Sequence, residues 1–300
     1  MLQFAPDQPP VTPKDAATLV LVRDAAAGLE VFCVERNKKV RFMGGAIVFP
    51  GGKLDPRDGD AVWERLANAP RERGLGFAKD AATLRALAVA ACRESLEEAA
   101  ILPVAGGRGA ATGALGAAAL GAEELLALRA AMAARPEALA EALDARGLVL
   151  DLAALAPFAH WVTPAAETRR FDARFFLARA PEGQPGAHDE GETMASFWAA
   201  PAEVLARHER SEVQLAPPTH RTLAILADAG AVEGAFAAAE RATLEPICPR
   251  LVKHTDARGE TLALVLPGDP DHELGAPLVA GPSRYVLRGE HWRPEAAPRG

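Results

Sequence analysis

Three glutamates with helical spacing, Glu94, Glu97 and Glu98, are the residues of this chain best suited to chemistry. On a helix, positions i, i+3 and i+4 share one face within a turn, so the three carboxylates would lie together. Like charges this close repel one another unless a cation lies among them. Mg2+ binds a few carboxylate oxygens together with water and phosphate oxygens, so the pattern indicates metal-dependent chemistry on a phosphate ester or anhydride. The alternative is a solvated helix face, which is common for charged residues.

A strand, a glycine turn and a helix must position these carboxylates. The apolar run at 46–49 predicts a short buried strand, and Pro50 followed by Gly51 and Gly52 ends it where the backbone turns sharply or lies against another group. Residues 81–100 contain neither Pro nor Gly and predict a helix of about five turns. We therefore expect the glutamates to stand beside a glycine turn.

The glycine turn and the predicted helix together resemble the Nudix box, a pattern of Gly, five residues, Glu, seven residues and then Arg-Glu-apolar-x-Glu-Glu-x-Gly-apolar. The second half of the box is carried by residues 93–101. Asp58 stands where the pattern has its first Glu, and 34 residues (59–92) separate it from the Arg-Glu pair where the pattern has seven. Ser95 replaces an aliphatic residue, and Ala100 replaces the Gly that would normally end the helix.

The interrupted box is similar to one branch of the Nudix family, related to the mammalian Nudix-type motif 19 acyl-CoA diphosphatase, in which a long insert divides the two halves of the box. Here the first half reads Phe-Pro-Gly-Gly-Lys-Leu-Asp at 49–55. The similarity extends from about residue 16 to about 295, with further matching segments at 161–164, 169–177, 215–218 and 266–269. The resemblance implies an α+β fold, a Nudix α/β/α sandwich with a mixed central sheet, a helical insertion and a small C-terminal β extension.

We expect a single Nudix hydrolase domain over residues 1–300 with four attached segments. The Pro-rich residues 1–15 suit an extended arm. Residues 56–80 are the insert within the Nudix box and would form one wall of the pocket. Residues 104–157 are a mostly helical insert, and residues 245–300 are the C-terminal β extension, which we expect to end in a Pro-rich tail.

The mostly helical insert is the segment in which we expect substrate specificity. Helical patterns at 123–134 and 136–146 follow an Ala/Gly-rich stretch at 105–121, which suggests a mobile or loosely packed loop. In a Nudix fold, insertions next to the core usually determine which leaving group fits. By this analogy of fold, the two helices would form a cap over the substrate.

The resemblance assigns a metal-dependent mechanism to the acidic residues. Glu94, Glu97 and Glu98 would hold Mg2+ or Mn2+, with water as the nucleophile. The general base would be Glu97 or Glu98, or else Glu190 or Glu192 on a polar loop farther along the chain. For the two loop residues, a solvated turn is the alternative.

Basic residues and glycines near the box are candidate contacts to the substrate. Arg93 would orient one of the glutamate carboxylates from within the helix. Arg36 directly follows a predicted strand and could face the substrate phosphates, or it could belong to a solvated loop. Lys53 and the backbone of Gly51 and Gly52 would approach the same phosphates.

Two neighbouring arginines, Arg169 and Arg170, stand between two predicted strands of the core sheet. They could reach the substrate phosphates or pair with the acidic helix, and a salt bridge to Glu167 is the structural alternative. Both possibilities are open. Asp55, at the end of the first half of the box, is expected to cap a turn.

The reaction expected from these features is hydrolysis of the pyrophosphate bond of a nucleoside diphosphate linked to another moiety. By resemblance we favour coenzyme A or acyl-CoA, with ADP-ribose, NADH and dinucleoside polyphosphates as alternatives. A non-catalytic Nudix-like module that binds a nucleotide is a different class of function. A binding module has no need of three mutually repelling carboxylates, so their presence favours an enzyme.

Composition narrows the partners and the compartment. The chain has 300 residues, 49% of them hydrophobic, and a net charge of −7, which argues against nucleic acid as a partner. Three cysteines without CxxC spacing argue against a structural zinc site or a disulfide framework. No segment has the pattern of a signal peptide or a membrane span, so we expect a cytoplasmic protein that does not bind a membrane. A homodimer is left open.

Overall fold

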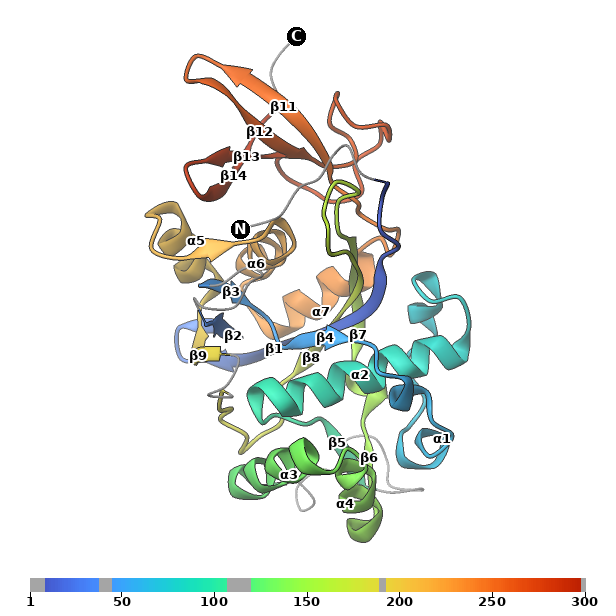
Figure 1. Cartoon of the computed structure of the whole chain (residues 1–300). Helices are drawn as coiled ribbons and strands as arrows, with labels where there is room; N and C mark the ends of the chain where they lie inside the picture. The colour runs from blue at the N-terminus through green and yellow to red at the C-terminus, as the bar shows by residue number, and fades with distance from the viewer. Residues whose placement is uncertain (1–8, 38–44, 107–119, 189–192, 298–300) are drawn as a thin grey trace.

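The computed structural model describes residues 9–37, 45–106, 120–188 and 193–297. Its centre is a sheet in the strand order β10-β3-β2-β1-β8-β7, with β4 paired to β1 and β9 paired to β2 (Figure 1). The β1/β8 and β10/β3 pairs are parallel and the others are antiparallel, so the predicted mixed sheet is confirmed. The strands are β1 (Lys14–Ala25), β2 (Gly28–Arg36), β3 (Ala46–Val48), β4 (Gly51–Lys53), β7 (Ala156–Val162), β8 (Phe171–Arg179), β9 (Thr193–Ala199) and β10 (Gln214–Leu215).

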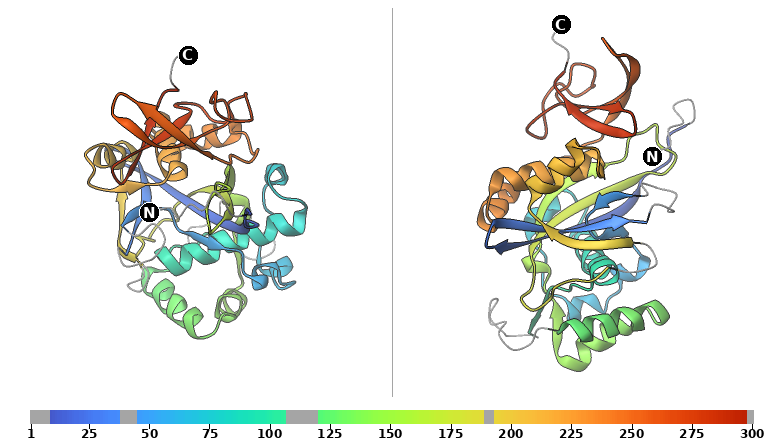
Figure 2. Two further views of the ribbon diagram at one scale, coloured as in Figure 1. Left: turned by 45° about the horizontal axis from the view of Figure 1, so that its top comes forward. Right: turned by 90° about the vertical axis from the view of Figure 1, so that its left-hand side faces the viewer.

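Helices cover both faces of this sheet (Figures 1 and 2). On one face lies α2 (Ala81–Ala99), and on the other lie α5 (Pro201–Glu209), α6 (Pro217–Ala229) and α7 (Val232–Arg241). Along β1, Leu19 and Leu21 belong to the core on the α2 side, whereas Val20 and Val22 belong to the core on the other side. A strand between two helical layers is apolar on both faces, and this arrangement confirms the predicted α/β/α sandwich.

The ends of α2 follow from its sequence. Asp80 caps the start, because its carboxylate accepts a hydrogen bond from the Thr83 amide at 2.7 Å. The helix ends at Ala100, which has a left-handed backbone with φ of 52° and whose amide donates to the Leu96 carbonyl at 3.0 Å. Glycine adopts this conformation most readily, so Ala100 forms the helix end that the Nudix box gives to Gly. The helix predicted at 81–100 is confirmed to within one residue.

The insert at 56–80 folds beside α2 as short helical turns. It contains η1 (Pro56–Gly59), α1 (Trp63–Leu66) and η2 (Glu72–Gly76). Trp63 and Leu66 of α1 are buried in the core on the α2 side and anchor the insert there.

The insert at 104–157 is helical with short strands at its borders. It comprises β5 (Val104–Gly106), α3 (Ala122–Ala134), α4 (Ala138–Arg146), β6 (Leu148–Leu150) and η3 (Leu152–Ala154). Its last two residues already belong to β7, and the helix predicted to open at Pro136 begins two residues later. Most of the loop predicted at 105–121 lies outside the described residues.

The C-terminal segment forms a separate antiparallel sheet in the order β11-β12-β13-β14 (Figure 1). Its strands are β11 (Arg250–Asp256), β12 (Gly259–Val265), β13 (Arg284–Arg288) and β14 (His291–Glu295). The expectation of a Pro-rich tail was wrong for β14, because an edge strand tolerates Pro294. The arm predicted at 1–15 was too long, since Lys14 and Asp15 already pair with β8.

Candidate active site

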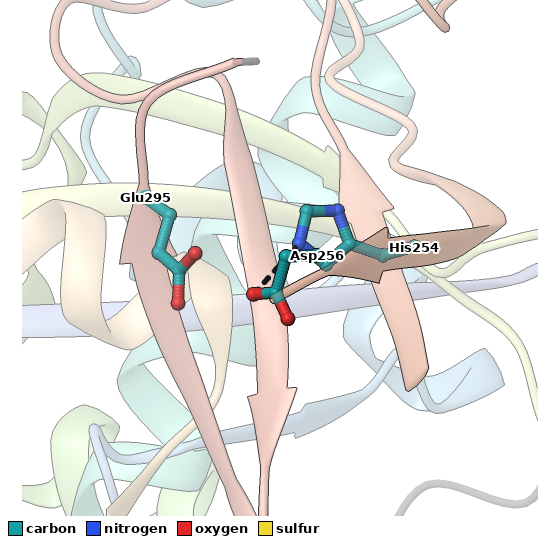
Figure 3. A group of neighbouring side chains, drawn as sticks. All are labelled: His254, Asp256 and Glu295. Atoms are coloured by element: carbon teal, nitrogen blue, oxygen red, sulfur yellow. Dashed lines mark ion pairs between the residues drawn. The ribbon is translucent and has the colours of Figure 1, made fainter. Parts of the chain in front are cut away.

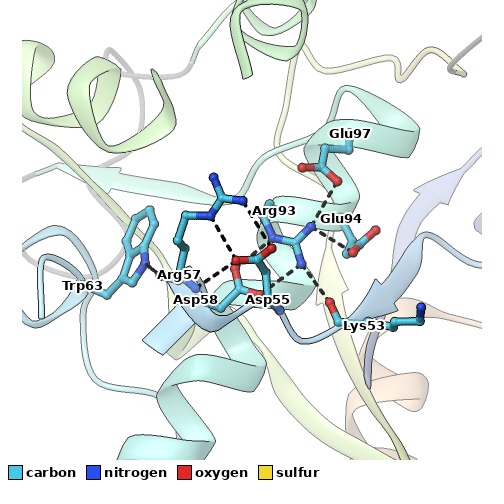
Figure 4. Close-up of polar contacts among 8 residues, drawn as sticks. All are labelled: Lys53, Asp55, Arg57, Asp58, Trp63, Arg93, Glu94 and Glu97. Carbon is cyan, nitrogen blue, oxygen red and sulfur yellow. Dashed lines mark hydrogen bonds and ion pairs between the residues drawn. The ribbon is translucent and has the colours of Figure 1, made fainter. Parts of the chain in front are cut away.

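A buried ion pair joins the two halves of the interrupted box (Figure 4). Arg93 on α2 donates to both carboxylate oxygens of Asp58, from Nε at 2.8 Å and from Nη2 at 3.0 Å. Asp58 is 2% exposed and also accepts a hydrogen bond from the Asp55 amide at 2.8 Å. Asp55 in turn caps η1, as the sequence predicted. The insert therefore begins with a turn that holds Arg93 in place.

The same guanidinium reaches two of the three glutamates. Its Nη1 donates to Oε1 of Glu94 at 2.9 Å and to Oε2 of Glu97 at 3.1 Å (Figure 4). Because both oxygens accept from one nitrogen atom, the two carboxylates lie close together. The expected contact between Arg93 and a neighbouring carboxylate is present twice.

Strand β4 contacts the remaining carboxylate and explains the Gly-Gly turn. The Gly51 amide donates to Oε2 of Glu98 at 3.0 Å. A Cβ atom on Gly52 would lie 2.4 Å from Oε1 of Glu94, and one on Gly51 would lie 2.6 Å from the Ala17 carbonyl oxygen. Gly52 lets the backbone lie directly against the Glu94 carboxylate, and Gly51 lets it lie directly against strand β1.

Burial makes the charged state of these carboxylates costly. It raises the pKa of Glu94 to about 7, with a further contribution from the neighbouring Glu97 charge. It also raises the pKa of Glu97. Burial alone would lower the pKa of Arg93, but the hydrogen bond to Asp58 and the surrounding carboxylates raise it instead. A cation added among these oxygens would stabilise their charged form.

The carboxylates open into a pocket of about 800 Å3, a size typical of small-molecule sites. Most of the residues that the sequence singled out line it. They are Arg36, Gly51, Gly52, Lys53, Glu94, Glu97, Glu98 and Arg169. Oxygen ligands beside a pocket of this size suit a hard divalent cation and a phosphate-containing molecule.

Three expectations about the site need correction or lie outside the structure. Arg170 does not line the pocket but donates to the carbonyls of Thr163 and Val11, at 3.0 and 2.9 Å, because neighbouring residues leave the chain in different directions. The insert at 56–80 lines no part of the pocket wall, since it packs beside α2 and acts there through Asp58. Glu190 and Glu192 lie outside the described residues.

Two further parts of the pocket wall contain residues that the sequence analysis did not single out. Arg129 and Ala133, one turn apart on α3, line it from the helical insert. An apolar wall comes from Phe49, Phe171 and other residues of the sheet. Arg129 resembles any solvated helix residue in sequence, and only the packing of α3 against α2 brings it here.

Arg36, Lys53, Arg129 and Arg169 form no ion pair with any acid that the structure describes, although all four line the pocket. The Nε atom of Arg36 is buried and has no hydrogen-bond partner among the described residues. A buried donor of this kind favours an anion, because leaving it unsatisfied costs free energy. The pocket therefore has acidic and basic groups that suit a metal ion and phosphates respectively.

A second group of potential metal ligands, His254, Asp256 and Glu295, lies in the C-terminal sheet (Figure 3). Arg288 donates to both carboxylates, including two bonds of 2.8 Å to Glu295. The guanidinium therefore occupies carboxylate oxygens of both residues that a metal ion would need. We interpret the group as an ion-pair network that ties β11, β13 and β14 together.

No helix in the described part of the chain is long and apolar enough to cross a membrane.

Comparisons with known proteins found a matching family model and similar sequences. The family model described as the NUDT19 Nudix domain matches residues 79–226. The acyl-coenzyme A diphosphatase NUDT19 of Gallus gallus is 29% identical over 272 residues, which cover 80% of this chain and 72% of that protein. The protein of the same name from Homo sapiens is 30% identical over 222 residues, 64% of this chain and 59% of the human protein. This chain thus spans less than two thirds of the human relative.

A solved structure gives the same result for the fold. The crystal structure of a NUDIX hydrolase from Alicyclobacillus acidocaldarius is 32% identical in sequence and superposes with a TM-score of 0.63. The alignment covers 76% of this chain and 96% of that chain.

Proposed function

The chain belongs to the Nudix hydrolase family, and on this premise we propose that it hydrolyses the pyrophosphate bond of coenzyme A or acyl-CoA. The products would be 3',5'-ADP and phosphopantetheine or its acyl derivative. The observation that carries the proposal is the pocket itself, in which three carboxylates on α2 stand with four basic side chains that lack acidic partners among the described residues. The animal relatives are named acyl-coenzyme A diphosphatases, which supports coenzyme A compounds as the substrate class.

Nudix hydrolases generally use divalent metal ions, and the donor set here fits one. Glu94, Glu97 and Glu98 offer only oxygen ligands, and burial of Glu94 leaves its charge in need of a cation. We propose Mg2+ or Mn2+ in this position, held by the three glutamates. When bound, the ion would supply positive charge that stabilises phosphate oxygens and favours loss of a proton from water.

The remaining groups have separate tasks. Arg93 fixes the Glu94 and Glu97 carboxylates through its bonds of 2.9 and 3.1 Å, which keeps them from turning away from the pocket. Arg36 and Lys53 would bind the diphosphate, Arg36 through donors that include its buried Nε. Water would attack a phosphorus atom, and one of the acidic residues would take its proton.

Glu97 is our first candidate for the proton acceptor. Its side chain is 40% exposed and lines the pocket, so it can meet a water molecule there. A carboxylate oxygen of Glu97 that the metal does not use could accept the proton of that water. Glu98, Glu190 and Glu192 are the other candidates, and single Gln variants at each position separate them.

The apolar wall suits the uncharged part of such a substrate. Phe49, Phe171 and Phe175 line the pocket together with Pro218. A pantetheine arm, with or without an acyl chain, would gain from burial against these side chains. ADP-ribose and dinucleoside polyphosphates have no comparable apolar arm, so this wall favours the coenzyme A compounds over them.

We also propose a cytoplasmic location. Its support is that Cys33, Cys92 and Cys248 are all free, which is typical of proteins in a reducing compartment. Fractionation of the source cells tests this part.

The function is tested with a substrate panel of coenzyme A, acetyl-CoA, NADH, ADP-ribose and diadenosine polyphosphates, each with Mg2+, with Mn2+ and with EDTA. Release of 3',5'-ADP from the coenzyme A compounds, abolished by EDTA, is the expected result. Faster metal-dependent cleavage of another compound would replace the substrate assignment. Nucleotide binding without turnover of any compound would instead support a binding module.

A further inference from the structure

Arg129 on α3 is a basic residue of the pocket wall that the fold holds firmly in place. Its Nη1 donates to the carbonyl oxygens of Ala187 and His188, at 2.9 and 3.1 Å. These two bonds use one nitrogen of a planar group that has five N–H donors. The remaining donors have no acidic partner among the described residues, and the side chain lines the pocket.

The other basic residues of the wall differ from it. Lys53 lines the pocket and directly follows the two glycines of β4, of which Gly51 donates to Glu98. Arg36 stands at the end of β2 beside β3, close to the same turn. Arg169 is an exposed residue of the β7–β8 connection with no hydrogen bond to the described part of the chain.

We propose that Arg129 forms a subsite for a phosphate monoester on the nucleoside of the substrate, the group that distinguishes coenzyme A from dephospho-coenzyme A. The inference rests on the proposed function and adds a specificity determinant to it. A clamped guanidinium binds an anion well because little conformational freedom is lost on binding and its fork of donors matches a phosphate. A flexible, exposed arginine attracts anions with less discrimination.

The neighbouring side chain leaves space for such a group. Ala133 follows Arg129 by four residues on the same face of α3 and also lines the pocket. Its methyl group cannot fill the space beside the guanidinium. The helical insert therefore presents one cation and a small residue to the pocket, which fits a compact anion better than an acyl chain.

The arrangement of the elements also indicates how the substrate would be oriented in the pocket. In Figures 1 and 2, α3 and the β7–β8 connection lie on opposite sides of α2. The phosphorylated nucleoside would extend from α2 toward α3. The pantetheine arm would extend toward β8, which supplies Phe171 and Phe175 to the apolar wall.

The rival location for the same phosphate is Arg169, on the other side of α2. Both are basic residues of the same pocket, so total charge does not distinguish them. A pair of ligands that differ only in the monoester does distinguish them. The product 3',5'-ADP and its analogue 5'-AMP, which lacks the 3'-phosphate, are such a pair.

The experiment measures dissociation constants of 3',5'-ADP and 5'-AMP by titration calorimetry with Mg2+ present, for the wild type, Arg129→Ala, Arg129→Gln and Arg169→Ala. Thermal melting of each variant checks that it is folded, and Arg129→Lys serves as the variant that retains the charge. We expect the wild type to bind 3',5'-ADP at least about 10-fold more tightly than 5'-AMP, as a charge-assisted hydrogen bond provides. Both uncharged Arg129 variants should bring this ratio close to one, while Arg169→Ala weakens both ligands alike.

Three results would overturn the subsite. They are a wild type without preference for 3',5'-ADP, a preference that survives in the Arg129 variants, and a preference that disappears in Arg169→Ala. A purely structural role of Arg129 in holding residues 187 and 188 would weaken both ligands equally and leave the ratio unchanged. Because binding and not turnover is measured, failure of coenzyme A hydrolysis is seen separately in the substrate panel.

Discussion

Arg93 and Asp58 are 35 positions apart in the sequence and form a buried, two-bond ion pair, with Nε to Oδ1 at 2.8 Å. The pair closes the long insertion that divides the box. Arg93 also holds the Glu94 and Glu97 carboxylates, so the position of the acidic cluster depends on an aspartate at the start of the insert. Predictions about stability and about activity follow from this dependence.

Asp58→Asn should destabilise the protein by about 2 kcal/mol, because the buried Asn would turn an NH2 group toward N–H donors of Arg93 or Asp55 that now bond to a carboxylate oxygen. Turnover should fall as well, since Arg93 loses the contact that fixes it. Urea denaturation followed by circular dichroism measures the free energy of unfolding. Asp60→Asn is the matched control, because Asp60 is exposed and lies two residues away. Equal unfolding midpoints for the two variants would contradict the proposed role of the pair.

Gly52→Ala should separate metal binding from folding. The new Cβ would meet the Glu94 carboxylate at 2.4 Å, and this carboxylate is the mobile end of a side chain. The side chain can move aside, so we expect the free energy of unfolding to change by less than about 1 kcal/mol. The displaced ligand should raise the Mn2+ concentration needed for half-maximal activity by about 10-fold or more.

The control for that substitution is Gly59→Ala, where a Cβ would have no neighbour within 4 Å. Metal titrations of activity for both variants and the wild type provide the comparison. An unchanged Mn2+ dependence in Gly52→Ala would contradict the assignment of Glu94 as a metal ligand.

Glu94 should make the metal-free protein less stable as the pH rises. Its pKa is about 7 in the folded protein, against an ordinary value of 4.5, so the folded state binds this proton more tightly than the unfolded chain does. The stability that comes from the proton is complete below pH 4.5 and is lost as the pH rises through about 7. Glu94→Gln, which stays neutral, should not show this loss.

Unfolding of the wild type and Glu94→Gln in EDTA from pH 5 to 8 measures the effect. The free energy of unfolding of Glu94→Gln should increase relative to that of the wild type as the pH rises, by an amount on the order of 3 kcal/mol at most. Excess Mg2+ should reduce the difference, because the ion binds the charged carboxylate. A difference in unfolding free energy between the two proteins that does not change with pH would show that burial does not raise the pKa of Glu94.

Parts of this site could be predicted because their signals are local. Helix 81–99 follows from a run of helix formers, and its acidic face follows from spacing alone. The sequence shows Asp58 at the position of the first Glu of the Nudix box, but its ion pair with Arg93 depends on how the insert folds back onto α2. The sequence offered no basis for distinguishing Arg169 from Arg170. In the structure, Arg169 lines the pocket, whereas Arg170 donates to the Val11 carbonyl and ties that segment to the β7–β8 connection.

Long-range packing explains what the sequence did not reveal. Arg129 reaches the pocket only because α3 packs on α2, and no local pattern distinguishes it from other arginines on helix surfaces. Strand β14 was missed because Pro294 argues against a strand, although an edge position accepts it.

The most direct test of the central claim is the rate of 3',5'-ADP release from coenzyme A with Mn2+ by the wild type, Glu97→Gln and Glu203→Gln. Glu203 is an exposed residue of α5 outside the pocket, so its variant controls for the loss of one negative charge. We predict that Glu97→Gln keeps its fold and loses at least about 100-fold in rate, while the control matches the wild type. Wild-type turnover in Glu97→Gln would contradict the assignment of the acidic face of α2 as the catalytic metal site.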